Sequence, residues 1–361
     1  MTVGVCLPSP LASPNIERTD NLLRRGEDDA LPRMWSRSGT VANVVDDTDG
    51  PRNHGMTSAE GADEAALERS YDTWLPLAVD TGEVLLKEAK QIMDDFGVVF
   101  FLRQGTCLGA IRDNALIPWD DDLDLGSVIG LHGLDGKSVD QVVDRVVAAF
   151  RDNGYFAKVE SNDQFLSVTM MKSSTRLDWL CHRIIDDSVY QYPGVRFPVS
   201  LFTELREIDF IGEKFLTPNP PEEYLRLKYG EEWMIPKRED YEKDVVGLIP
   251  VGPIAGQPGL WKQFFAKHFL PSRSGKIRIL DHEGEPVAGA DVVVVGLNRS
   301  RTDRRGYASF YLPRDDFYAL IIRYRGHEEV LYQESMAPGA VYVYRPDPAE
   351  TAGRFRALSQ E

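Results

Sequence analysis

The spacing of apolar residues predicts the first elements of an α/β domain. Over residues 64–96, apolar side chains recur every three or four positions, which predicts an amphipathic helix. The stripe consists of Leu85, Leu86, Ala89, Ile92 and Met93. The dense apolar run at 97–104 predicts a strand, and residues 105–114 predict a tight turn with a short helix. The alternation of "DLDLGSVI" at 122–129 then returns to the strand pattern.

The same kind of pattern continues further along the chain. Residues 138–154 predict an amphipathic helix that Gly154 ends. The stretch "TPNPPEEYLRLKYGEEW" at 217–233 predicts another helix, with prolines at its start, acids in its first turn and Gly230 placed to end it. Strands are expected between them over residues 155–160, 165–172 and 176–185. Together these elements predict an α/β (α+β) domain over residues 66–250.

The chain changes character after this domain. Residues 251–273 predict a Pro/Gly-rich linker with a short helix at 260–270. Over residues 274–347, short β runs are separated by turn signals such as "DHEGEP" and "TDRRG". Regular short strands at this spacing predict a small all-β sandwich. Residues 348–361 are expected to form a polar tail.

The N-terminal segment 1–65 is rich in Pro, Ser, Asp, Arg and Gly without a sustained period, and we expect it to be disordered. It lacks the basic start and long apolar core of a secretory signal, and the apolar runs of the chain are too short to span a bilayer. The cysteines, Cys6, Cys107 and Cys181, form no Cys-x-x-Cys pair, which favours a reducing compartment. We therefore expect a cytoplasmic protein.

The charge balance argues against one class of function. A net charge of −16 over 361 residues and a pI near 4.9 disfavour a protein that coats nucleic acid through its overall field. An acidic protein still handles a phosphorylated substrate where metal ions and local cations neutralise the site.

Candidate chemistry is concentrated in the stretch "IPWDDDLDLGSV" at 117–128, which holds four aspartates within five positions. Carboxylates repel each other and resist burial, so the cluster needs a compensating partner. Strand alternation places Asp120, Asp122 and Asp124 on one face, opposite the core-facing Leu123 and Leu125. Asp121 is expected to lie before regular strand geometry begins. Two carboxylates at alternate positions suit a hard cation.

Two other interpretations of these aspartates are a calcium-binding loop and a solvated acidic turn. A calcium loop of the EF-hand type requires Gly at its sixth place and Glu at its twelfth. Counted from Asp120, those places hold Leu125 and Leu131, so this interpretation fails. A solvated acidic turn remains the simple alternative to a metal site.

The turn that precedes the aspartates suits a phosphate group. A strand that ends in "QGT" and enters a helix offers backbone N–H groups at a positively polarised helix end. Gly105 would allow close approach of a phosphate, and Thr106 could either cap the helix or contact an oxygen. Arg112, further along the helix, could neutralise a phosphate or be a surface residue. A strand, Gly-Thr turn, short helix and Asp-x-Asp strand is the arrangement of the nucleotidyltransferase fold.

These segments resemble the LicD family, which includes bacterial phosphocholine transferases and the fukutin-related proteins. The stretch "LRQGTCLGAIRDNALIPWDDDLDLG" resembles the family's first signature. "PNPPEEYLRLKYGEEWMIP" resembles its second conserved block, and "RLDWLCHRI" resembles the intervening strand that supplies a third acid, here Asp178. Asp186 or Asp187 are substitutes for Asp178 in this role.

The resemblance implies a nucleotidyltransferase-like domain and a transfer reaction. A phospho-alditol or phosphocholine group would move from a CDP-activated donor to a glycan hydroxyl on a cell-surface polymer such as teichoic acid, with release of CMP. Mg²⁺ or Mn²⁺ would bind Asp122 and Asp124, with Asp120 and Asp178 as further ligands. The alternative role for Asp178 is to accept the hydroxyl proton. The acceptor would be a glycan or lipid-linked polymer that the protein meets peripherally at a membrane, without a transmembrane segment and without nucleic acid.

The β-rich region resembles a carboxypeptidase-regulatory-like, transthyretin-like domain, through "SGKIRILDHEGEPVAGADVVVVG" and "TDRRGYASFYLP". This resemblance implies a sandwich that contacts a glycan or docks on its neighbour. Two alternative functions stay open: a nucleotidyltransferase that transfers a nucleotide to a small acceptor, and a non-catalytic glycan-binding scaffold.

Overall fold

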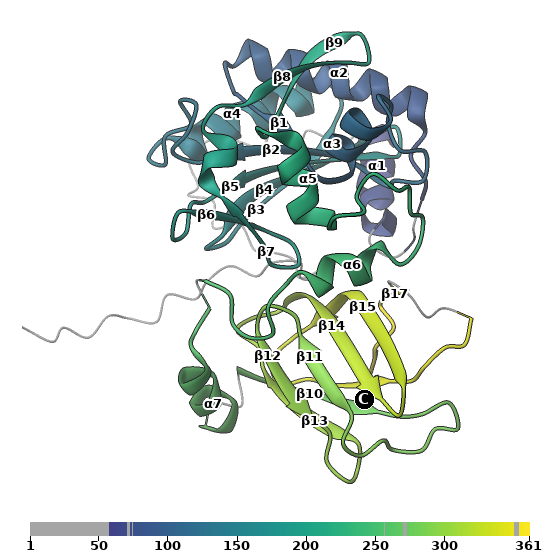
Figure 1. The fold of residues 1–361 in the computed structure, drawn as a ribbon. Coiled ribbons are helices and arrows are strands. Elements are labelled where there is room, and N and C mark those ends of the chain that lie inside the picture. Colours follow the sequence, from purple (N-terminus) through teal and green to yellow (C-terminus); the bar gives the residue numbers. More distant parts are fainter. Residues whose placement is uncertain (1–57, 71–72, 74, 256, 270–272, 350–353) are drawn as a thin grey trace, which may run out of the picture. The chain divides into compact units, whose positions relative to one another are not determined.

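The computed structural model describes residues 58–70, 73, 75–255, 257–269, 273–349 and 354–361 (Figure 1). Most of the predicted disordered segment 1–65 lies outside the described residues. Its last part is a helix instead, because α1 (Ser58–Ser70) begins at Ser58. Ala66 and Leu67 of α1 are buried in a small cluster with Met171, so tertiary packing stabilises a segment whose own periodicity is weak.

A five-stranded mixed sheet forms the centre of the α/β domain, with the strand order β1-β2-β5-β4-β3. The strands are β1 (Phe101–Leu102), β2 (Asp122–Val128), β3 (Phe156–Ser161), β4 (Phe165–Lys172) and β5 (Thr175–His182). Strands β2 and β5 are parallel, and the other neighbours are antiparallel. The predicted α/β architecture is confirmed.

The helices of this domain follow the predicted apolar stripes. They are α2 (Val79–Asp95), α3 (Gln104–Arg112), α4 (Val139–Asp152), α5 (Pro221–Tyr229) and α6 (Tyr241–Gly247), with a 3₁₀ turn at Val199–Phe202. All five residues of the stripe predicted for α2 are buried. Pro221 lies in the first turn of α5, and Gly230 follows its last residue at φ +86°, a conformation that favours glycine. Helix α2 contacts α4, and α4 contacts β3 (Figure 1).

Two hairpins complete the domain. One joins β6 (Ser188–Gln191) to β7 (Val195–Pro198), and the other joins β8 (Arg206–Phe210) to β9 (Glu213–Thr217). Tyr224 of α5 stacks on Phe197 of β7 at 4.8 Å between ring centroids. Its hydroxyl donates a hydrogen bond to Gln191 Oε1 on β6, so the first hairpin and α5 are held together.

The C-terminal region has α7 (Leu260–Phe269) and then two sheets with the strand orders β13-β10-β16-β18 and β12-β11-β14-β15-β17. Its strands are β10 (Ser274–Ile279), β11 (Asp291–Val294), β12 (Asn298–Arg301), β13 (Tyr307–Tyr311), β14 (Asp316–Tyr324), β15 (His327–Met336), β16 (Val341–Tyr344), β17 (Arg354–Phe355) and β18 (Ser359–Gln360). Apolar side chains from both sheets share one core, which confirms the predicted all-β region.

The described residues of the predicted polar tail at 348–361 include two short strands. Strand β17 pairs with β15, and β18 pairs with β16 in antiparallel register. The exposed sheet edges accept these short polar strands through backbone hydrogen bonds, which apolar periodicity does not reveal. None of the helices in the described part of the chain is both long and apolar enough to cross a membrane.

Candidate active site

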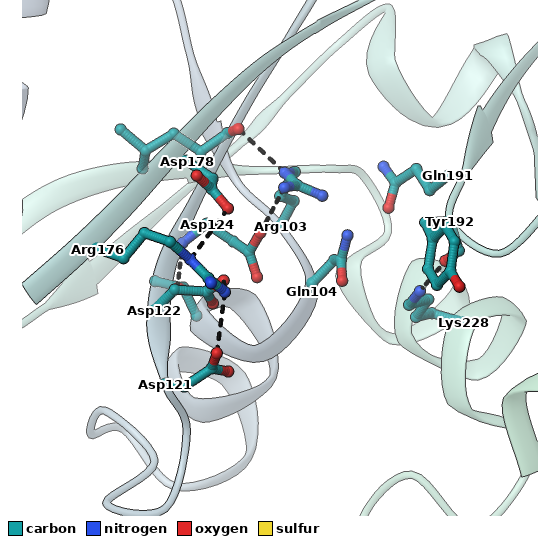
Figure 2. Close-up of polar contacts among 12 residues, drawn as sticks. Arg103, Gln104, Asp121, Asp122, Asp124, Arg176, Asp178, Gln191, Tyr192 and Lys228 are labelled. Carbon is teal, nitrogen blue, oxygen red and sulfur yellow. Dashed lines mark hydrogen bonds and ion pairs between the residues drawn. The ribbon is translucent and has the colours of Figure 1, made fainter. Parts of the chain in front are cut away.

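The acidic residues of β2 and β5 come together because the two strands are parallel and in register. Asp122 lies opposite Arg176, and Asp124 lies opposite Asp178. Alternate side chains of a strand share a face, so these four residues project from the same side of the sheet (Figure 2). The intervening side chains, Leu123, Leu125, Leu177 and Trp179, are fully buried on the other side. The predicted orientation of Asp122 and Asp124 therefore agrees with the strand geometry.

Asp120 and Asp121 precede β2 and extend the acidic cluster. One carboxylate oxygen from each of Asp120, Asp121 and Asp122 lies within 4.8 Å of the others. As predicted, Asp121 lies before the regular strand, and it lines the same cavity as its neighbours although it was not among the predicted metal ligands. Strand alternation does not apply to Asp121, because β2 begins only at Asp122.

Burial and mutual repulsion make the cluster electrostatically unfavourable for a protein without a bound cation. Burial, followed by repulsion from Asp122, raises the pKa of Asp120 well above its ordinary value and that of Asp121 to about 6. Burial also raises the pKa of Asp124 and Asp178, although Arg103 and Arg176 act in the opposite direction. The site thus favours any cation that enters.

Two arginines pair with the cluster in the described part of the chain. Arg103 Nη2 lies 2.5 Å from Asp124 Oδ1, and Arg103 Nε donates to the backbone oxygen of Leu125 at 3.1 Å. Arg176 Nη2 lies 2.9 Å from Asp121 Oδ2 and also contacts Asp122, and its Nε lies 3.5 Å from Asp178 (Figure 2). Neither arginine was predicted as a site residue. The sequence position of Arg176 could have identified it, because it lies two residues before Asp178 in a predicted strand and so on the same face.

Gly105 is required by the close approach of a carboxylate. A Cβ atom placed on Gly105 would lie 2.0 Å from Asp120 Oδ2, so either the Asp120 side chain or the turn would have to move. The preceding Gln104 has a positive φ of +44°, and its backbone N–H donates to the Tyr224 hydroxyl at 3.0 Å. The turn that enters α3 is therefore shaped by both Asp120 and α5. The predicted phosphate contact of Gly105 stays a prediction, and Gly105 does line the cavity.

Thr106 and Arg112 have different surroundings. Thr106 is buried, and its hydroxyl oxygen accepts a hydrogen bond from the backbone N–H of Asp124 at 2.8 Å. Arg112 lines the cavity and forms an ion pair with Asp113 at 2.6 Å. Thr106 is not among the residues that line the cavity, so its hydroxyl fixes the backbone of an acidic residue instead.

Asp178, rather than Asp186 or Asp187, is the third acid that reaches the cluster. Asp178 lines the cavity, whereas the other two lie in the exposed turn that precedes β6. One oxygen of Asp178, Oδ1, is buried and has no hydrogen-bond partner among the residues that the structure describes. Such an oxygen is a ready ligand.

The donor set fits a hard divalent cation. Mg²⁺ and Mn²⁺ prefer carboxylate oxygens, and the five carboxyl groups offer more negative charge than two guanidinium groups balance. Asp120, Asp121, Asp122, Asp124 and Asp178 are the residues that would hold it.

Lys228 of α5 adds a buried amine to the cavity lining. It is 1% exposed, and its Nζ donates to the backbone oxygen of Tyr192 at 2.6 Å. Burial, followed by the positive charge of Arg103, lowers the pKa of Lys228 to about 7. The helix pattern around "YLRLKYG" gave no indication that this lysine is buried.

The comparison with known proteins agrees with this site. Residues 97–220 match the family model described as LicD/FKTN/FKRP, nucleotidyltransferase domain. This segment is therefore similar to LicD-type nucleotidyltransferase domains. Human ribitol-5-phosphate transferase FKTN is 29% identical over 182 residues, 46% of this chain and 36% of that protein. Mouse ribitol 5-phosphate transferase FKRP is 29% identical over 152 residues, 38% of this chain and 29% of that protein.

The chain spans about a third of the length of these curated relatives. The LicD match covers the segment from β1 to the start of α5, and therefore all five acids of the cluster. The resemblance of the β-rich region to carboxypeptidase-regulatory-like domains stays a prediction.

Proposed function

We propose that this chain is a metal-dependent phosphotransferase. It moves a phospho-alditol or phosphocholine group from a CDP-activated donor to a glycan hydroxyl on a cell-surface polymer, and CMP is released. The observation that supports this most strongly is that five carboxyl groups, three from β2 and β5 and two from the residues just before β2, line one cavity inside the segment that matches the LicD family model. The two relatives named as ribitol-phosphate transferases support an alditol as the transferred group.

The acidic residues have distinct tasks in this reaction. Asp122 and Asp124 would hold Mg²⁺ or Mn²⁺, with Asp120 and Asp121 as further ligands, while Asp178 would either complete this ligand set or accept the hydroxyl proton. When bound, the cation offsets the charge of the donor diphosphate and of the leaving CMP. Thr106 keeps Asp124 in place through the backbone of that residue. Gly105 leaves the space that the carboxylate of Asp120 occupies.

The bond changes follow from the donor chemistry. The oxygen of the acceptor hydroxyl attacks the phosphorus atom that bears the transferred group, and the bond from that phosphorus to the bridging oxygen breaks. The electron pair leaves on CMP. The hydroxyl proton passes to a carboxylate, and Asp178 is suited to accept it because burial raises its pKa and its Oδ1 has no described hydrogen-bond partner.

The acceptor would be a glycan or a lipid-linked polymer. Arg112 lines the cavity and would add positive charge for the donor phosphates. The β-sandwich over residues 274–347 would contact the glycan or dock on the preceding domain, as its resemblance implies. Under this proposal, the α/β domain binds the donor, and the β-sandwich contributes to the selection of the acceptor.

A donor screen tests the proposal. The purified chain is incubated with CDP-ribitol, CDP-glycerol or CDP-choline and Mn²⁺, with and without glycan acceptors, and CMP release is measured. We expect release from at least one donor, and loss of it with a chelator or in an Asp122→Asn/Asp124→Asn variant. Pyrophosphate together with a nucleotidylated acceptor would instead establish the nucleotidyltransferase alternative. Glycan binding without release of either product would establish the scaffold alternative.

A further inference from the structure

We propose that Arg176 competes with the metal for the acidic cluster and is displaced from it when the metal binds. Its guanidinium group contacts Asp121, Asp122 and Asp178 (Figure 2). The same three carboxylates belong to the set that fits a divalent cation. A guanidinium group and a metal ion repel each other and compete for the same oxygens. The two therefore exclude each other from this position.

The register of the sheet makes this placement specific. Arg176 lies directly opposite Asp122 on the neighbouring parallel strand, so its side chain starts from the same sheet face as the acids. Asp178 follows two residues later on that face. The backbone of Arg176 is therefore held by the sheet, and its side chain extends along the sheet face to the carboxylates.

Arg103 differs from Arg176 in how it is held. Arg103 is anchored to the main chain, because its Nε donates to the oxygen of Leu125 while its Nη2 pairs with Asp124. The ion pairs of Arg176 are with carboxylates that line the cavity, and a further hydrogen bond runs to the hydroxyl of Ser70 at 3.5 Å. Arg176 contacts three of the carboxylates that would hold the metal, whereas Arg103 pairs with Asp124 and is also held by the main chain, so Arg176 is the arginine with which a metal competes more directly.

Displacement gives Arg176 a second task. Its side chain lines the cavity and is 12% exposed, so its guanidinium group has a path toward the donor. Arginine binds phosphate oxygens in a bidentate manner, and a released guanidinium group beside the cluster would bind a phosphate of the CDP moiety. Metal would then bind before the donor, because the metal frees the arginine that the donor needs.

Mn²⁺ titration by calorimetry, without any donor, tests the first step. Arg176→Gln removes the competing charge and should lower the Mn²⁺ dissociation constant by at least about tenfold, because a cation a few ångströms from the metal site is lost. Arg206→Gln is the matched control: Arg206 pairs with the exposed Glu222 at 3.2 Å, and this variant should bind Mn²⁺ as the wild type does. An unchanged or higher dissociation constant in Arg176→Gln would overturn the proposal.

A second variant and a measurement of CMP binding complete the test. If Arg176→Gln fails to fold, Arg176→Lys serves instead, because its single ammonium group contacts fewer carboxylates and should also bind Mn²⁺ more tightly than the wild type. With saturating Mn²⁺, CMP should bind Arg176→Gln more weakly than the wild type, and equal CMP affinity would overturn the second task of Arg176. Mn²⁺ affinity does not depend on which group is transferred, so this inference and the proposed function fail separately.

Discussion

Asp124 on β2 and Asp178 on β5 lie opposite each other in parallel register, and each contacts a different arginine. Two carboxylates on adjacent strands repel each other, so the pairing of β2 with β5 brings an electrostatic cost at this position. Arg103 contacts Asp124 and Arg176 contacts Asp178, and these ion pairs reduce that electrostatic cost. Arg176 of β5 and Arg103, which lies between β1 and α3, therefore balance part of the negative charge of the acidic face.

Replacing both Asp122 and Asp124 with asparagine should abolish the stabilisation that Mn²⁺ gives the wild type. A ligand present at about 100 times its dissociation constant adds about 2.7 kcal/mol to the free energy of unfolding. A neutral amide binds a hard cation much more weakly than a carboxylate does. Thermal unfolding with and without Mn²⁺ measures the effect. Asp187→Asn, in the exposed turn before β6, should keep the full shift, and an equal shift in the double variant would disprove the assignment.

Gly105→Ala should destabilise the chain by about 1–3 kcal/mol, the usual cost of inserting an atom into a filled space. The new Cβ atom would collide with Asp120 Oδ2. Urea-induced unfolding measures the loss. Gly247→Ala is a suitable control, because an added Cβ there has no atom within 4 Å.

A second substitution separates this collision from a general backbone effect. Asp120→Ala removes the carboxylate that Gly105 accommodates, so Gly105→Ala should cost much less in that background. A double-mutant cycle gives the coupling between the two positions. If the two changes are additive, the role assigned to Gly105 is wrong.

Local periodicity was sufficient for the parts of the fold that rest on local geometry. The apolar stripe of α2 and the alternation of β2 both agree with the structure, and alternation alone placed Asp122 and Asp124 on one face. Gly230 ends α5 as predicted. These features depend on the side chains of neighbouring residues, so a single sequence contains them.

The remaining features depend on contacts between distant segments. Arg176 joins the cluster only because β5 pairs with β2, a partnership that the sequence does not specify. The Thr106 hydroxyl accepts a hydrogen bond from the backbone N–H of Asp124, eighteen positions away. Thr106 is not among the residues that line the cavity, where a contact with a phosphate oxygen was one of its two predicted roles. Asp121 was correctly predicted to precede the regular strand, but its place beside the other acids of the cavity follows from the turn before β2, which alternation does not describe. Such placements require the register of the sheet.

Thr106→Val should lower the free energy of unfolding by about 1–3 kcal/mol, the cost of leaving a buried donor without an acceptor. Valine keeps the shape of threonine but offers no oxygen to the backbone N–H of Asp124. Thr106→Ser retains the oxygen and is the matched control, with a much smaller loss. Mn²⁺ affinity should fall in the valine variant as well, because Asp124 is then less well fixed. Equal unfolding curves for the two variants would show that this hydrogen bond does not hold the strand.

His182 predicts a pH dependence of stability whose sign is fixed by burial. The ring is fully buried at the end of β5, and neither nitrogen has a hydrogen-bond partner among the described residues. Burial, followed by the charge of Arg103, lowers the pKa of His182 from its ordinary 6.5 to about 3. The unfolded chain therefore binds a proton near pH 6.5 that the folded chain does not bind until about pH 3. His182 thus lowers stability as the pH falls through that window.

His182→Leu should remove this dependence. Below pH 6.5, the wild type should lose stability relative to the variant by up to about 1.4 kcal/mol per pH unit. Asp121 acts in the opposite direction, because its pKa is raised to about 6 and the folded chain binds that proton first. Both proteins share the contribution of Asp121, so it cancels in their difference. Urea-induced unfolding at about pH 7.5, 6 and 5 measures that difference, and a constant value across the series would mean that the folded chain protonates His182 as readily as the unfolded chain does.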